Sequence, residues 1–173
     1  MPKHLTVDYM KCTGCRICEM SCAYKHYGTS NTEFSKIKVH NFFPGIDIPN
    51  FCFKCSDAPC ISGCPFNALS KNEDECIEVD IEKCTGCGLC VKKCRAKVIN
   101  LHPNQKYPMI CNDCGKSEPE CAKNCPTKAL DYVTLPFDGK YLANVPEEIC
   151  SELSKNLYSD VSFEETKIIK KGE

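Results

Sequence analysis

Residues 64–90 read CPFNALSKNEDECIEVDIEKCTGCGLC: a cysteine before proline, a polar turn, the strand-like CIEVD, and three further cysteines on one loop. Outward from this stretch, sixteen of the eighteen cysteines fall into four quartets of similar spacing. The quartets are Cys12, Cys15, Cys18 and Cys22; Cys52, Cys55, Cys60 and Cys64; Cys84, Cys87, Cys90 and Cys94; and Cys111, Cys114, Cys121 and Cys125. Only Cys76 and Cys150 stand outside the pattern.

The spacing of the quartets indicates the kind of metal. Four thiolates suit either a tetrahedral zinc ion or a cubane cluster, because thiolate sulfur is a soft ligand. The first and third quartets read C-x2-C-x2-C-x3-C, which is typical of iron–sulfur loops. A zinc ribbon needs two well-separated C-x2-C pairs instead. Gly14, Gly86 and Gly88 permit the backbone angles that turn N–H groups toward sulfur. We therefore predict four [4Fe–4S] clusters, with structural zinc as the alternative.

Composition excludes several other classes of protein. This density of cysteine can mark a disulfide-stapled secreted domain. However, MPKHLTVDYMKC at the start lacks the features of a signal peptide, and no apolar run approaches the roughly 20 residues of a membrane span. We therefore expect a cytoplasmic protein with reduced thiols and no membrane span. With 22 basic and 23 acidic side chains, the chain has no field that attracts nucleic acid.

The chain contains an internal repeat. DYMKCTGCRICEMSC, residues 8–22, is echoed by DIEKCTGCGLCVKKC, residues 80–94. Residues 64–90 resemble bacterial ferredoxins with two [4Fe–4S] clusters, and the match covers both cysteine patterns and the connecting hairpin. This resemblance implies an α+β fold of two interleaved ferredoxin modules. Residues 51–101 form the inserted module, residues 1–50 plus 102–134 form the split module, and residues 135–173 form a C-terminal tail.

The ferredoxin resemblance also implies which cysteines share a cluster, because the last cysteine of each ferredoxin quartet binds the partner cluster. The inner clusters then take Cys52, Cys55 and Cys60 with Cys94, and Cys84, Cys87 and Cys90 with Cys64. The outer clusters take Cys12, Cys15 and Cys18 with Cys125, and Cys111, Cys114 and Cys121 with Cys22. The alternative is that each quartet holds its own cluster.

A more specific resemblance comes from the widened quartets, C-x2-C-x4-C-x3-C-P and C-x2-C-x6-C-x3-C-P. Residues 1–133 are similar to electron-transfer subunits of molybdenum or tungsten pterin enzymes, some hydrogenases and carbon monoxide dehydrogenases. The stretch HYGTSNTEFSKIKVHNFFPGIDIPNFC, residues 26–52, most resembles the small subunits of tungsten-containing aldehyde oxidoreductases of anaerobes. The resemblance implies a heterodimer in which a larger catalytic subunit oxidises an aldehyde at tungstopterin. This chain, which is not an enzyme on its own, passes the electrons to a carrier such as ferredoxin.

Two segments extend beyond a bare ferredoxin. The loop 23–51 contains a β-prone run, Phe34 to Phe43, then the turn Phe43-Pro44-Gly45 and aromatic residues that we expect to be exposed. In the tail, Pro146 can begin a helix whose apolar face carries Ile149, Leu153 and Leu157. That face either packs on this chain or docks on a catalytic subunit. The charged run 164–173 is expected to fray.

The remaining residues offer no second chemistry. Cys76 and Cys150 are interpreted as small buried hydrophobes, and His4, His26, His40 and His102 as exposed or capping residues, because they lack paired metal-site spacing. Three hypotheses stay open: a dedicated electron-transfer subunit of a pterin enzyme, hydrogenase, formate or carbon monoxide dehydrogenase; a free polyferredoxin; and a structural-metal scaffold. Because so little carbon surface is available for burial, we expect the chain without metal to be largely unfolded.

Overall fold

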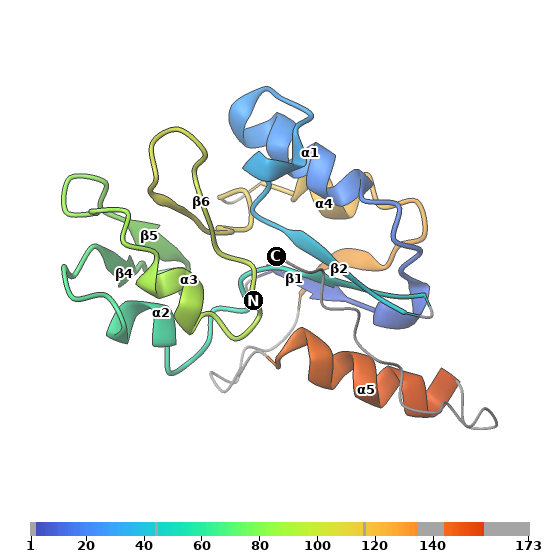
Figure 1. Cartoon of the computed structure of the whole chain (residues 1–173). Helices are drawn as coiled ribbons and strands as arrows, with labels where there is room; N and C mark the ends of the chain where they lie inside the picture. The colour runs from blue at the N-terminus through green and yellow to red at the C-terminus, as the bar shows by residue number, and fades with distance from the viewer. Residues whose placement is uncertain (1–2, 44, 116, 135–143, 158–173) are drawn as a thin grey trace.

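The structure is a computed structural model that describes residues 3–43, 45–115, 117–134 and 144–157. It is a mixed α+β protein of short elements (Figure 1). The helices are α1 (Ile17–Tyr27), α2 (Pro59–Ser62), α3 (Leu89–Lys93), α4 (Glu120–Lys123) and α5 (Pro146–Leu157), and the 3-10 turns are η1 (Tyr9–Lys11) and η2 (Thr32–Phe34). The strands are β1 (Lys3–Val7), β2 (Lys38–Phe42), β3 (Ile46–Asn50), β4 (Leu69–Lys71), β5 (Ile77–Val79), β6 (Asn100–Leu101), β7 (Pro108–Met109) and β8 (Leu130–Thr134).

The strands of the described residues form antiparallel pairs rather than one broad sheet. Three pairs join strands that are neighbours in sequence: β2 with β3, β4 with β5, and β6 with β7. The fourth pair joins β1 to β8, with Leu5 opposite Tyr132, and so connects the two ends of the cysteine-rich region. Helix α1 packs against α4, and α2 packs against α3. Figure 1 accordingly shows two lobes, one with α2, α3, β4 and β5 and the other with α1, α4, β1 and β8.

Each lobe has a small core in which quartet cysteines lie among aliphatic side chains. In one lobe Leu5, Ile37 and Leu130 pack with five buried quartet cysteines. In the other, Leu69 and Ile77 pack with Cys60, Cys90 and further aliphatic residues. Because no large carbon core exists in the described residues, the cysteine loops occupy the interior positions that apolar side chains fill in larger domains.

The loop between α1 and the second quartet forms a hairpin at the expected turn. Gly45 has a φ of 124°, which residues with a Cβ avoid, and its N–H donates to the Phe42 carbonyl at 2.8 Å. The expected strand from Phe34 to Phe43 is shorter in the structure, where β2 covers only Lys38–Phe42. Phe34 instead ends the turn η2 and packs its ring on His102, with centroids 5.3 Å apart.

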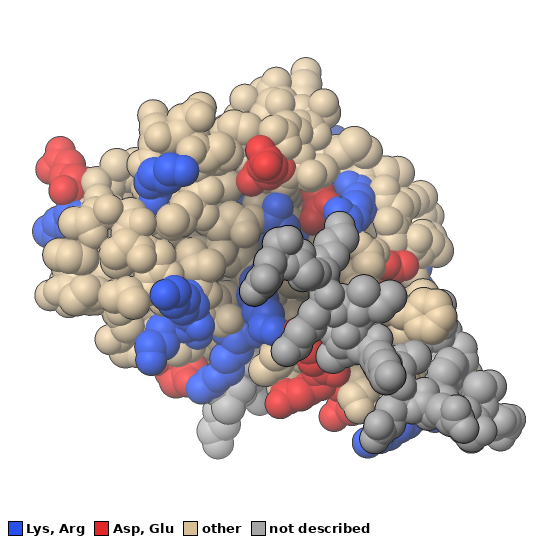
Figure 2. Space-filling view, viewed as in Figure 1, with Lys and Arg blue, Asp and Glu red and all other residues tan. Residues whose placement is uncertain are grey.

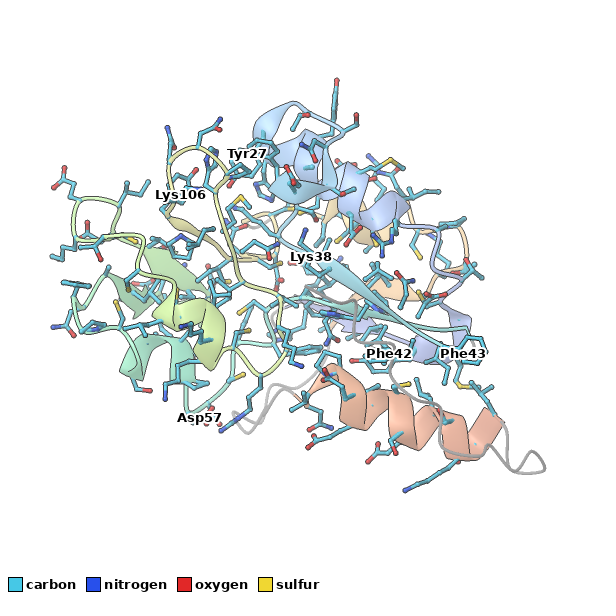
Figure 3. The ribbon with its side chains drawn as sticks, in the orientation of Figure 1. Tyr27, Lys38, Phe42, Phe43, Asp57 and Lys106 are labelled. Atoms are coloured by element: carbon cyan, nitrogen blue, oxygen red, sulfur yellow. The ribbon has the colours of Figure 1, made fainter. Side chains whose placement is uncertain are left out.

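The prediction of exposed aromatics is right at one position and wrong at another. Phe43 lies at the tip of the hairpin with 79% of its surface exposed (Figure 3). Phe51, by contrast, is buried and packs against Phe53, with ring centroids 4.7 Å apart. The difference follows from position, because Phe51 directly precedes the second quartet and belongs to the core around it.

Helix α5 begins at Pro146 as expected, and acidic Glu147 and Glu148 lie in its first turn, where the helix dipole favours negative charge. Ile149 is buried against Ile46 and Ile48 of β3, while Leu157 is 45% exposed. In the structure the helix therefore packs on this chain. The expected charged terminus, 164–173, lies outside the described residues. Among the described helices, none has the length and apolar character needed to cross a bilayer.

Candidate metal centres

The structure places the last cysteine of one quartet beside the first three of another. Two small cavities show this arrangement directly. One is lined by four cysteines that we name group 1: Cys12, Cys15, Cys18 and Cys125. The other is lined by the four that we name group 4: Cys64, Cys84, Cys87 and Cys90. Both sets cross between quartets as the ferredoxin pattern predicts.

The other two sets are brought together by electrostatic proximity between thiols. Group 2 joins Cys22 to three cysteines of the fourth quartet, each close enough for the charge of Cys22 to affect its pKa: Cys111, Cys114 and Cys121. Group 3 consists of Cys52, Cys55, Cys60 and Cys94. In the described residues no three His, Cys, Asp or Glu side chains form a site for a single metal ion. The grouping is a finding about neighbours, and iron ligation by these sixteen cysteines remains a prediction.

All four cysteine loops share one unusual backbone position, two residues after the first cysteine. Gly14 and Gly86 occupy it with φ of 65° and 69°. At Gly14 an added Cβ would meet the Asp47 carboxylate, whose side chain would have to move, and it would also strain the positive φ. Lys54 and Asp113 occupy the same position in the other loops, with φ of 52° and 50°. The N–H groups of Gly14, Lys54 and Asp113 each donate to the first thiol of their loop and favour its thiolate form.

Lys54 and Asp113 also form an ion pair that joins two loops, and sequence reasoning missed it. Lys54 Nζ lies 2.8 Å from Asp113 Oδ2, and the side chains are only 9% and 6% exposed. Burial alone would lower the pKa of the Lys54 ammonium, but its hydrogen bond to Asp113 and the charge of that carboxylate raise it. The signal in the sequence was positional, since both residues stand where the repeat has glycine in its other copies.

The ion pair and the cores together order the four groups in space. Groups 1 and 2 share one core, and groups 3 and 4 share the other, while Cys52 packs against both. The Lys54–Asp113 pair links the loop of group 3 to the loop of group 2. The order is therefore group 1, group 2, group 3 and group 4. Every cysteine is described, and the exposed ones are Cys15 in group 1 and Cys87 in group 4, the two ends of the series.

Burial raises the pKa of eight of the quartet thiols above the ordinary value of a cysteine. It raises the pKa of Cys18 and Cys52 to about 12 and that of Cys60 to about 11. Cys125 is the exception: burial alone would raise its pKa, but hydrogen bonds from the Leu130 N–H and the Thr127 hydroxyl lower it. Buried thiolate sets with N–H donors around them fit a soft, positively charged metal group, and binding such a group releases their protons.

Two of the histidines have defined roles near these sites. His102 is buried and its Nδ1 accepts hydrogen bonds from the backbone N–H groups of Asn104 and Gln105, at 3.3 and 3.1 Å, so the expected capping role is confirmed there. His26 is half-buried, and its Nε2 lies 3.7 Å from Cys114 Sγ. Burial, with smaller effects of Lys36 and Lys25, lowers the pKa of His26 to about 4.

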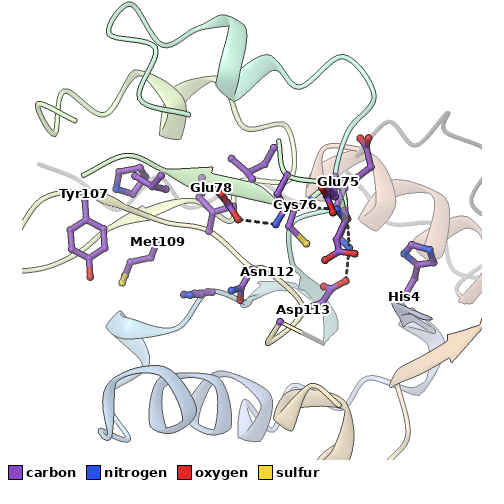
Figure 4. A pocket seen from close by; sticks show the side chains of 18 of the residues that line it. His4, Glu75, Cys76, Glu78, Tyr107, Met109, Asn112 and Asp113 are labelled. Carbon is purple, nitrogen blue, oxygen red and sulfur yellow. Dashed lines mark hydrogen bonds and ion pairs between the residues drawn. The ribbon is translucent and has the colours of Figure 1, made fainter. Parts of the chain in front are cut away.

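The cysteines outside the quartets differ from each other. Cys76 is buried, but it also hydrogen-bonds the Lys54 ammonium, so it is more than an apolar filler. Cys150 is half-buried against the α5–β3 core. Cys76 and the Lys54–Asp113 pair line an open cleft of about 950 Å³ between the lobes (Figure 4). None of the quartet cysteines lines this cleft.

Cysteine loops of ferredoxin spacing, collected into four neighbouring sets, define an iron–sulfur protein of the electron-transfer class. The 4Fe-4S binding domain family matches residues 77–100. The polyferredoxin-like subunit of aliphatic sulfonate oxidoreductase from Pyrococcus furiosus is 36% identical over 156 residues, which cover 87% of this chain and 90% of the relative. The chain belongs to this family of [4Fe–4S] electron-transfer subunits of oxidoreductases, which are not catalytic themselves.

A further relative is named for a different enzyme. The thiosulfate reductase electron transfer subunit PhsB of Salmonella typhi is 31% identical over 153 residues, 76% of this chain and 79% of that protein. Among solved structures, a chain of the active site complex of benzoyl coenzyme A reductase with benzoyl-CoA is 23% identical, covers 90% of each chain and has a TM-score of 0.48.

Proposed function

We propose that the chain carries four [4Fe–4S] clusters, one in each of groups 1 to 4, as a relay between a larger catalytic subunit and an external carrier such as ferredoxin. The clusters are held by two interleaved ferredoxin modules, 51–101 inserted into 1–50 plus 102–134, with the tail 135–173 outside both. The bound clusters supply reversible one-electron reduction. The thiols hold them in sequence, and the N–H groups of the loops offset their negative charge.

One observation carries the proposal: the four cysteine groups form an unbroken series with exposed cysteines only at its ends, among cysteines that are all described. A relay needs each centre to neighbour the next and needs both ends accessible to partners. Cys52, which contacts both cores, and the Lys54–Asp113 pair supply the middle junction. Cys15 and Cys87 supply the accessible ends. The cysteines of the two inner groups are all buried or partly buried.

The surface supports a stable complex over a freely diffusing carrier. Diffusing carriers gain encounter rate from a strong net charge, whereas this chain has a formal net charge of −1. Figure 2 shows both basic and acidic side chains on the face in view. A free polyferredoxin remains the second candidate, because each exposed end would serve a diffusing partner equally well.

We infer that the catalytic subunit is a tungstopterin enzyme. The resemblance of residues 26–52 supports an aldehyde oxidoreductase. The Pyrococcus furiosus relative, named as a subunit of aliphatic sulfonate oxidoreductase, supports a sulfonate substrate. Hydrogenases, formate dehydrogenases and carbon monoxide dehydrogenases are the alternative partners.

The test is anaerobic purification from the native host, with iron, sulfide, tungsten and molybdenum measured across the size-exclusion peak that contains this chain. About sixteen iron and sixteen sulfide per chain are expected from four four-iron clusters. Tungsten that co-elutes in a peak larger than the chain alone supports the tungstopterin partner. Molybdenum, nickel or a monomeric peak excludes it, and zinc in place of iron overturns the relay. With tungsten present, adding aliphatic sulfonates or aldehydes and recording which reduces the clusters decides the substrate.

A further inference from the structure

We propose that His26 is a positioning residue for the group 2 cluster: its Nε2–H donates a hydrogen bond to the Cys114 thiolate, and Lys36 fixes the ring in that tautomer. The inference rests on the proposed function, because it requires a cluster at group 2. It adds a side chain from outside the cysteine loops to the residues that set the properties of one centre.

The hydrogen-bond directions follow from the contacts of the His26 ring. Nδ1 lies 3.4 Å from Lys36 Nζ, and Nε2 lies 3.7 Å from Cys114 Sγ. A lysine ammonium has only donors, so Nδ1 must accept from it. In a neutral imidazole the other nitrogen then carries the hydrogen. Nε2–H therefore points at the sulfur, which becomes a pure acceptor when it binds iron.

Lys36 contributes a second hydrogen bond to the same group through its backbone. Its N–H donates to Cys22 Sγ at 3.3 Å. Lys36 thus serves two sulfurs of group 2, Cys22 directly and Cys114 through the His26 ring. The geometry depends on where α1 ends: Gly28 caps it with φ of 67°, which lets the chain turn back and brings Lys36 alongside His26.

With this hydrogen bond, the group 2 cluster should be easier to reduce than it would be with the hydrogen bonds of its cysteine loop alone. Reduction adds one electron to the cluster, donated by a neighbouring centre, and no covalent bond forms or breaks. The added negative charge on sulfur strengthens hydrogen bonds to it, so donors favour the reduced state and raise the potential. The proton stays on Nε2 throughout.

The test is an EPR-monitored redox titration of the holo-protein and its variants. His26→Phe keeps an aromatic ring but removes the donor. We expect one of four midpoints to fall, with about a tenfold drop in the equilibrium constant for reduction, or about 59 mV for one electron. His26→Gln, whose amide N–H can donate, should restore part of the shift. Lys36→Met keeps the backbone N–H and the His26 ring but removes both the constraint on the tautomer and a positive charge, so the same midpoint should also fall. His40→Phe replaces a half-buried histidine whose electrostatic partners in the described residues include no quartet cysteine, so it is the matched control and should leave all four midpoints unchanged.

Iron content measured on the same samples distinguishes a failure of the His26 role from a failure of the four-cluster relay. About sixteen iron in wild type and His26→Phe, with all four midpoints unchanged, overturns the role of His26 and leaves the relay standing. A wild type that lacks the fourth cluster overturns the proposed function itself. If His26→Phe loses iron, the His26→Gln and Lys36→Met titrations decide. Unchanged midpoints in both variants overturn the inference, and a midpoint lowered in both supports it, because His26→Gln leaves the Lys36 charge in place.

Discussion

Lys54 and Asp113 occupy a left-handed backbone position that costs a residue with a Cβ about 1–2 kcal/mol. Glycine in the other two loops avoids that cost. Unlike glycine, the two residues have charged side chains, and these form the 2.8 Å ion pair between the loops of groups 2 and 3. A buried ion pair adds little net stability, but breaking it leaves a charge without a partner. We therefore expect its main effect to be that it fixes the register of the two cysteine loops it joins.

Replacing Lys54 with Met should therefore destabilise the holo-protein by about 3–5 kcal/mol, because the Asp113 carboxylate is left buried and Cys111 Sγ lies only 3.8 Å from it. The measurement is the urea midpoint under anaerobic conditions. Lys71→Met, which breaks the more exposed Lys71–Glu75 pair, is the control and should cost less than about 1 kcal/mol. Adding Asp113→Asn to Lys54→Met should recover much of the loss. Equal midpoints for Lys54→Met and the control would show that the pair has no structural role.

At the scale of elements, the sequence predicted correctly those turns, strands and helix ends that depend on neighbouring residues. The hairpin turn at Gly45, the strand around Ile77 and the helix start at Pro146 all follow from residues within a few positions. The pairing of β1 with β8 was not predicted, because nothing in the sequence near either strand identifies a partner more than a hundred residues away. Phe34 left the expected strand for a related reason: one of its ring partners, His102, lies far away in the sequence.

Helix α5 offers a test of packing by a single element. Ile149→Ala should weaken its contact with Ile46 and Ile48 of β3 by about 2–5 kcal/mol, the usual cost of truncating a buried aliphatic side chain. Hydrogen exchange should then speed up in α5 and β3 while iron content stays constant. Leu157→Ala, at the exposed end of the same face, is the matched control. If both variants exchange alike, the helix is not anchored through Ile149.

For the molecule as a whole, the cores are so dependent on cysteine that metal binding and folding should be one event. Removing iron with a chelator under reducing anaerobic conditions should abolish most of the far-ultraviolet circular dichroism. Reconstitution with iron and sulfide should restore it. A chelated protein that keeps its helical spectrum would show that the polypeptide folds without clusters.

The series of groups predicts where the relay can be cut. Cys55→Ser removes a thiol from group 3, an inner position, and should stop electrons passing from the substrate of the catalytic subunit to an external acceptor. Cys87→Ser acts at the end group and should block exchange there alone. Cys150→Ser, outside the quartets, is the control and should leave the rate unchanged. A normal rate in Cys55→Ser would disprove a single linear path.

The pairing of β1 with β8 has a consequence for how the protein is made. During synthesis β1 leaves the ribosome first, and β8 follows only after the sequence of the other lobe and most of its own lobe has emerged. The lobe with α2 and α3 can close on itself meanwhile, since its hairpin partners are neighbours in the chain. The lobe with α1 and α4 cannot close until synthesis reaches Leu130, so its first cysteines stay exposed to solvent until then. Delivery of iron and sulfide is therefore expected to proceed from the middle of the chain outward, with the first-made quartet finished last.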